Sequence, residues 1–144
     1  MKVKIADIRP CGNRIKLLTL VPEGNGSLPE FSAGAHIDLH LANGLIRQYS
    51  LCDYPVQNNQ YRIAVLREDE SRGGSHYIHD DLKVGDTVEI SEPRNLFPLA
   101  EQQNRALLFA GGIGITPLIA MFEALQQQGI EVKLYYFCRS EADA

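Results

Sequence analysis

The strongest constraint on the fold is a change of sequence pattern near residue 100. Before it, short stretches of apolar residues alternate with turn signals, whereas after it a single strand–turn–helix–strand succession follows. Short strands separated by turns indicate an antiparallel barrel or sandwich. A strand, a helix and a second strand indicate a parallel βαβ unit. The sequence therefore predicts two domains, residues 1–100 and residues 101–144.

The first region is predicted to contain six short strands and one helix. A tight Asn43–Gly44 turn between two alternating apolar stretches is a strong hairpin signal, because both residues tolerate the positive φ of a two-residue turn. Pro22 and the glycine-rich stretch after it end the second strand. The strands are expected at residues 2–9, 15–21, 36–41, 45–51, 61–67 and 87–90, and the helix at residues 75–82.

The second region follows a polar linker at residues 101–104. We expect a strand over residues 105–110, a glycine-rich turn, a helix over residues 117–128 and a strand over residues 131–138. These elements predict one right-handed βαβ unit. Two parallel strands and one helix cannot cover both faces of a parallel sheet, so we expect this domain to be incomplete at its C-terminal end.

The charge balance argues against partners that need a basic surface. The chain has 14 Lys and Arg against 18 Asp and Glu, with no basic run suited to nucleic acid or an anionic membrane. The longest apolar run is far shorter than the ~20 residues of a membrane-spanning helix, and the charged start argues against a signal peptide. The cysteines and histidines lack metal-ligand spacing, and the thiols are expected to be reduced and mostly buried. We therefore expect a cytoplasmic protein with no metal, nucleic acid or membrane partner.

The glycine-rich turn is a candidate nucleotide site. Gly111, Gly112 and Gly114 follow an apolar strand and allow close approach of the backbone to a ligand. Amides at a helix N-terminus favour an anionic pyrophosphate. Thr116 suits the N-cap and Pro117 the first helical position. The alternative is a tight strand-to-helix turn without a ligand.

Two stretches of the first region offer further ligand groups. Arg47 has donors suited to phosphate, Tyr49 an aromatic ring, and Ser50 a hydroxyl, all at the end of one strand. Alternation predicts that Arg47 and Tyr49 share one face and Ser50 the other. Residues 72–75 (Arg-Gly-Gly-Ser) provide free amides and a hydroxyl at a helix start. Each stretch alone also fits a surface strand or a flexible loop.

Taken together and in order, these motifs resemble the ferredoxin reductase superfamily, and more narrowly the reductase components of aromatic-ring and demethylating oxygenases. The resemblance covers essentially the whole chain. Its motifs are Arg47-x-Tyr49-Ser50-Leu51, Arg72-Gly73-Gly74-Ser75, Pro93-Arg94-Asn95-x-Phe97-Pro98 and Gly111-Gly112-x-Gly114-x-Thr116-Pro117.

The resemblance implies a six-stranded antiparallel Greek-key β-barrel that binds flavin, followed by the first βαβ unit of an α/β nicotinamide-binding domain. Thr116 and Tyr49 are then the residues expected beside the reacting ring. The flavin is expected to contact Arg47, Tyr49, Ser50, the backbone of Ala64 and Val65, and Gly73, Gly74 and Ser75. The nicotinamide nucleotide is expected to contact Gly111, Gly112, Gly114, Thr116 and Arg139.

The same resemblance implies electron transfer from NAD(P)H through flavin to an iron–sulfur centre that serves an oxygenase or demethylase component. The compact segment at residues 93–98 favours FMN over FAD. The [2Fe–2S] cluster belongs to a C-terminal domain that this sequence lacks. Two other readings stay open: a flavin-binding fragment without catalysis, and a ligand-free barrel that serves as an interaction domain. The choice between NADH and NADPH and the oligomeric state also stay open.

Overall fold

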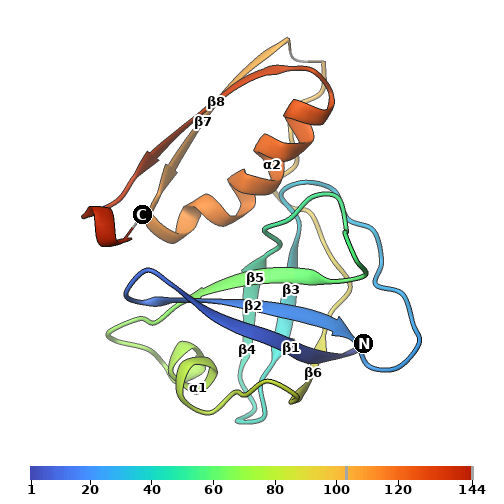
Figure 1. Cartoon of the computed structure of the whole chain (residues 1–144), viewed down its shortest axis with the longest axis vertical. Helices are drawn as coiled ribbons and strands as arrows, with labels where there is room; N and C mark the ends of the chain where they lie inside the picture. The colour runs from blue at the N-terminus through green and yellow to red at the C-terminus, as the bar shows by residue number, and fades with distance from the viewer. Residues whose placement is uncertain (103, 144) are drawn as a thin grey trace.

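The computed structural model describes residues 1–102 and 104–143. They form two regions, a six-stranded sheet with a short helix and, beyond it, two parallel strands with a longer helix (Figure 1). Gln103 of the expected linker and Ala144 of the expected second domain lie outside the described residues. The elements are β1 (Lys2–Cys11), β2 (Ile15–Pro22), β3 (His36–His40), β4 (Ile46–Ser50), β5 (Tyr61–Leu66), α1 (Gly74–Asp80), β6 (Thr87–Ile90), β7 (Arg105–Gly111), α2 (Ile115–Gln127) and β8 (Glu131–Phe137).

The sheet of the first region has the order β4–β3–β6–β1–β2–β5, and every pairing in it is antiparallel. β6 lies between β1 and β3, although both of these strands come much earlier in the sequence. The six-stranded antiparallel fold is thus confirmed. The sheet curls until its edge strands β4 and β5 approach each other, and beyond the end of β4 Cys52 N donates to Arg62 O at 2.9 Å. No ladder joins β4 to β5 in the described part of the chain, so the barrel has an open seam.

The core of this barrel follows from strand alternation. Along β5 the side chains of Tyr61, Ile63 and Val65 are buried, whereas the intervening residues face outward. Val3 and Ile5 of β1 contribute to the same core, as does Ile78 of α1, which covers one end of the barrel. Each such side chain contributes roughly 1.5–3 kcal/mol through removal from water.

In the second region β7 and β8 are parallel, as the sequence predicts, and α2 covers one face of the pair. Its apolar stripe includes Leu118, Met121 and Leu125, all buried. Gly129 has a φ of 73°, the left-handed conformation that commonly ends a helix. In the described part of the chain, neither helix is long and apolar enough to traverse a bilayer.

The helix α2 also packs against the barrel. Ala33, from the loop before β3, belongs to the same buried cluster as Ala120 and Met121. A side chain at Gly34 would collide with Phe97 O and the Met121 methyl group, so glycine is required where these segments meet. The carboxylate of Glu123 accepts a 2.8 Å hydrogen bond from Tyr54 N. The two regions are therefore joined through α2.

Two sequence predictions need correction. The helix α2 begins at Ile115, after a 3₁₀ turn, so Thr116 lies inside the first turn rather than at the N-cap. Pro117 is tolerated there because amides of the first turn have no intrahelical acceptor. The cysteines are free, but the expectation that most of them are buried is wrong, since only Cys52 is buried. Cys11 is exposed because it lies at a hairpin tip, and Cys138 is exposed because it lies just beyond the end of β8.

Candidate functional site

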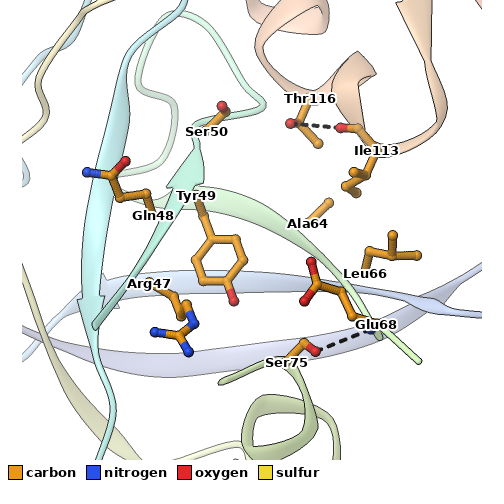
Figure 2. Close-up of a pocket in the computed structure, with 10 residues that line it drawn as sticks. All are labelled: Arg47, Gln48, Tyr49, Ser50, Ala64, Leu66, Glu68, Ser75, Ile113 and Thr116. Atoms are coloured by element: carbon orange, nitrogen blue, oxygen red, sulfur yellow. Dashed lines mark hydrogen bonds between the residues drawn. The ribbon is translucent and has the colours of Figure 1, made fainter. Parts of the chain in front are cut away.

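A cavity of about 280 Å³ opens at the seam between β4 and β5. The start of α1 borders one end of it, and the turn before α2 borders the other (Figure 2). It therefore uses residues from both regions of the molecule. Its lining residues are Arg47, Gln48, Tyr49, Ser50, Ala64, Leu66, Glu68, Ser75, Ile113 and Thr116.

In the described part of the chain, no strand pairs with β5 on the cavity side at Ala64. In an antiparallel strand the N–H and C=O of successive residues point alternately to the two sides. Arg62 O accepts from Cys52 N on the β4 side, whereas Arg67 N donates to Arg14 O on the β2 side. Alternation therefore directs the N–H and C=O of Ala64 toward the cavity. They can form hydrogen bonds with the edge of a planar ligand.

The arginine strand and the Gly-Gly-Ser segment meet at one end of this cavity. A Cβ placed on Gly74 would lie 2.6 Å from Nε of Arg47, so the guanidinium crosses directly over this glycine. Gly73 has a φ of 99°, which only glycine adopts readily. Arg47 donates to Ile46 O at 2.8 Å, and its remaining donors are suited to a phosphate. The structure thus brings together these two segments, which the family resemblance assigns to one site.

Ser75 completes this end of the cavity. Its buried hydroxyl oxygen accepts a 3.2 Å hydrogen bond from Glu68 N. A hydroxyl that accepts in this way still has its proton available for donation. With Arg47 and the Gly73–Gly74 backbone, Ser75 forms a set of hydrogen-bond donors suited to a phosphate group.

Tyr49 occupies the middle of the cavity, with its ring directed inward (Figure 2). Burial raises the pKa of its phenol to about 12; Glu68 adds to the rise and Arg47 opposes it. The phenol is therefore neutral near pH 7 and can donate a hydrogen bond. Its ring offers a flat apolar surface to an aromatic ligand.

Ser50 and Thr116 lie at the far end, opposite the Arg47–Ser75 end (Figure 2). Thr116 is buried, and its hydroxyl donates to Ile113 O at 3.1 Å within the turn before α2. Alternation predicts Ser50 on the face opposite Tyr49, yet both line the cavity because β4 ends at Ser50. Both hydroxyls can bond a polar ring edge.

The remaining predicted residues lie elsewhere. The Val65 side chain is fully buried in the barrel core and its carbonyl bonds His79 Nε2 at 2.8 Å, so the structure does not bring Val65 to the cavity. Gly112 and Arg139 line a neighbouring cavity of about 240 Å³, which shares Ile113 and Leu66 with the first. Gly111 and Gly114 are exposed and line neither of these two cavities.

Sequence reasoning missed Gln48, Leu66, Glu68 and Ile113 in the cavity wall. Leu66 could have been found, because it lies two residues beyond Ala64 on the same side of β5. Ile113 could also have been suspected, since it lies inside the glycine-rich turn. Glu68 follows the end of the strand, where a charged residue is typically solvated and gives no signal.

The cavity presents its chemistry in order: Arg47 and Ser75 at one end, the Tyr49 ring and Ala64 of β5 in the middle, and the hydroxyls of Ser50 and Thr116 at the other end (Figure 2). A barrel with such a seam, followed by a βαβ unit whose first turn reaches the same cavity, defines the ferredoxin reductase type of flavin and nicotinamide protein.

Comparisons with known proteins agree with this class. The chain is 49% identical over 140 residues to a vanillate O-demethylase oxidoreductase of Pseudomonas sp. (strain HR199 / DSM 7063), covering 97% of this chain and 44% of the relative. It is 44% identical over 144 residues to the tert-butanol monooxygenase / tert-amyl alcohol desaturase reductase subunit of Aquincola tertiaricarbonis, covering 100% of this chain and 43% of the relative. The solved phthalate dioxygenase reductase superposes with a TM-score of 0.93 at 40% identity, covering 97% of this chain and 44% of that structure.

Over nearly its whole length the chain is therefore similar to reductases of oxygenase and demethylase systems, which share the ferredoxin reductase-like fold. Its resemblance to the reductase components of aromatic-ring and demethylating oxygenases is thereby confirmed. The chain spans 43–44% of the length of these relatives. No protein-family model matches it.

Proposed function

We propose that this chain is the flavin-binding part of a reductase component that passes electrons from NAD(P)H through flavin to an iron–sulfur centre of an oxygenase or demethylase system. The convergence of Arg47 with Gly74 and Ser75 beside the Tyr49 ring is the observation that carries this proposal. The proposal is supported by relatives at 44–49% identity, which are reductases of demethylase and monooxygenase systems.

In this proposal the chain's own residues hold and orient the flavin. Arg47, Gly73, Gly74 and Ser75 bind its phosphate, and Tyr49 packs against its ring. Ser50, Thr116 and the backbone of Ala64 bond the polar ring edges; the core position of Val65 favours Ala64 as the main contact on β5. A bound flavin accepts a hydride and releases electrons singly, while the protein supplies position and exclusion of water.

The nicotinamide nucleotide is assigned to the turn and strand end of the second region. Gly111, Gly112 and Gly114 allow close approach of a pyrophosphate, and an added Cβ on any of them meets nothing within 4 Å. Arg139 lies in the neighbouring cavity with Gly112 and is proposed to contact the adenosine side. The proposed domain division remains 1–100 for flavin and 101–144 for the start of the nicotinamide domain.

FMN is the proposed flavin, with FAD less favoured. The segment at residues 93–98 is held close to the barrel: Arg94 pairs with Asp38 at 2.7 Å, and Asn95 donates to Ala33 O at 2.9 Å. A segment held in this way does not extend over the barrel surface as a shelf for adenine. The proposed electron acceptor is an oxygenase or demethylase component, through a [2Fe–2S] centre outside this sequence.

The test is a flavin titration of the purified chain, with visible absorption and the mass of any released cofactor. We expect FMN to bind, and Arg47→Ala to weaken FMN about 10–100-fold, because hydrogen bonds to charged groups contribute about 1.5–3 kcal/mol. Tyr49→Ala should also weaken retention and leave the barrel folded. Arg105→Ala, which alters an exposed ion pair on β7, is the control.

A folded chain that binds no flavin contradicts the proposal and favours the interpretation as a ligand-free barrel. Bound flavin without NADH oxidation favours the interpretation as a flavin-binding module without catalysis.

A further inference from the structure

The carboxylate of Glu68 stands out in a cavity whose other charged group is cationic. It lines the same wall as Ser75 and points toward the hydroxyl end of Tyr49 (Figure 2). A carboxylate disfavours a nearby phosphate, yet this one lies close to the phosphate donors. Any contact between this exposed carboxylate and a phosphorylated ligand would therefore fall on a part of the ligand other than the anion.

We propose that Glu68 binds the hydroxyl-bearing sugar chain of the flavin, between the phosphate end and the ring end of the cavity. This inference rests on the proposed function, since it assumes that the cavity receives a flavin. An ionised carboxylate only accepts hydrogen bonds, so its natural partner is a neutral donor such as a hydroxyl. A polyol chain that joins a phosphate to a ring presents such donors at this position.

The backbone holds Glu68 in place for this role. Its N–H donates to Ser75 Oγ at 3.2 Å, and its carbonyl oxygen lies 2.8 Å from His76 Nε2. Both partners belong to α1, so Glu68, two residues beyond the end of β5, is fixed to the helix that borders the cavity. A side chain on a fixed backbone loses less conformational freedom on binding a ligand than one on a free loop.

The surrounding charges leave the Glu68 carboxylate available to a ligand. Arg67, the preceding residue, pairs with Asp80 at 2.5 Å, and Arg14 pairs with Asp69 at 2.7 Å. Glu68 itself forms no ion pair in the part of the chain that the structure describes. Tyr49, the nearest polar ring, keeps its proton near pH 7 and does not add a second negative charge.

The test compares three flavins that differ only along the proposed contact: FMN, riboflavin, which lacks the phosphate, and lumiflavin, which also lacks the sugar chain. Their affinities are measured by fluorescence quenching for the unmodified chain, Glu68→Ala and Glu68→Gln. Glu70→Gln is the matched control, because Glu70 is exposed, lies two residues away and does not line the cavity. Thermal unfolding of each variant checks that the fold is kept.

We expect Glu68→Ala to weaken FMN and riboflavin alike, about tenfold, and to leave lumiflavin within twofold. Glu68→Gln keeps a carbonyl acceptor and should retain most of the riboflavin affinity.

If both variants bind FMN more tightly with riboflavin unchanged, Glu68 only repels phosphate and the inference is wrong. An equal loss for all three flavins assigns the effect to Tyr49 or the fold and also overturns it. If the unmodified chain binds none of them, the proposed function itself fails.

Discussion

The barrel and the βαβ region differ in how they exclude water from their apolar side chains. The barrel keeps its core away from water, with Ile5, Leu20 and Ile63 fully buried, although the seam between β4 and β5 is open. The parallel pair β7–β8 is covered by α2 on one face only. On the other face Leu107, Phe109, Tyr135 and Phe137 are 45–63% exposed.

This difference shows that the second region depends on the first. Its buried cluster includes Ala33 of the barrel and is joined by Tyr54 from the loop after β4. Parallel sheets usually need both faces covered, so a half-covered pair relies on contacts outside itself. The cavity lies at the joint between the two regions, where Thr116 of α2 meets Tyr49 and Ser50 of β4. The relative position of the regions therefore determines the geometry of the site.

The largest expected effect comes from truncating a core side chain of the barrel. Leu20→Ala should lower the free energy of unfolding by about 2–5 kcal/mol, because it removes buried methyl groups and leaves a cavity. The matched change in the second region, Leu134→Ala, affects a half-buried side chain and should cost about 1 kcal/mol. Urea unfolding followed by circular dichroism measures both. Equal costs would mean that the two regions are equally well packed, contrary to the comparison.

A pH dependence of stability should come from the barrel at high pH. Burial raises the pKa of Tyr61 from 10.0 to about 12, and its phenol donates to Pro29 O. Because the folded state favours the neutral phenol, the stabilisation is complete below pH 10 and is lost as the pH rises toward 12. The loss is at most about 3 kcal/mol, at 1.36 kcal/mol per unit of pKa.

Chemical unfolding at a series of pH values from 8 to 12 measures this dependence. Tyr61→Phe keeps the ring and removes the ionisable group, so its stability should fall less steeply over the same range. Parallel curves for the two proteins would show that another group, such as Tyr49 or Cys52, whose pKa values are also raised to about 12, causes the loss.

Much of the fold could be predicted because local signals agree with it. The Asn43–Gly44 turn, the alternation along β5 and Gly129 after α2 each have one favourable structural reading. Of the four ordered motifs, three contribute residues to the cavity wall, and the Arg47–Gly74 contact joins two of them. The turn, strand and helix-end signals depend on the conformational preferences of a few neighbouring residues, whereas the shared cavity of the motifs was implied by the family resemblance.

The rest depends on contacts between distant residues and could not be predicted. The open seam arises where β4 and β5 diverge. No single residue of either strand predicts this divergence. Glu68 faces the cavity because Ser75 and His76 hold its backbone. The exposure of Cys11 and Cys138 likewise depends on where their segments end, and residue type alone favoured burial.

A smaller effect is expected at the joint. Glu123 of α2 accepts from Tyr54 N at 2.8 Å, and Gln127, one turn later, donates to Tyr54 O at 3.4 Å. Glu123→Ala should weaken the joint by about 1–2 kcal/mol, because it removes a charged acceptor from a partly buried amide. Hydrogen exchange should quicken in α2 and stay unchanged in β1 and β2. Glu123→Gln, which can still accept, is the control; uniform acceleration over both regions would mean that they unfold as one unit.

The smallest expected effect is on the exposed face of β7–β8. Phe109 and Tyr135 stack there with ring centroids 5.1 Å apart, and Phe109 is 61% exposed. Phe109→Thr keeps strand propensity and removes an exposed ring, so the free energy of unfolding should change by no more than about 0.5 kcal/mol. Urea unfolding at low protein concentration measures it. A loss above about 1.5 kcal/mol would show that this face is covered in solution, and the contrast between a fully buried barrel core and a half-covered sheet would then have to be abandoned.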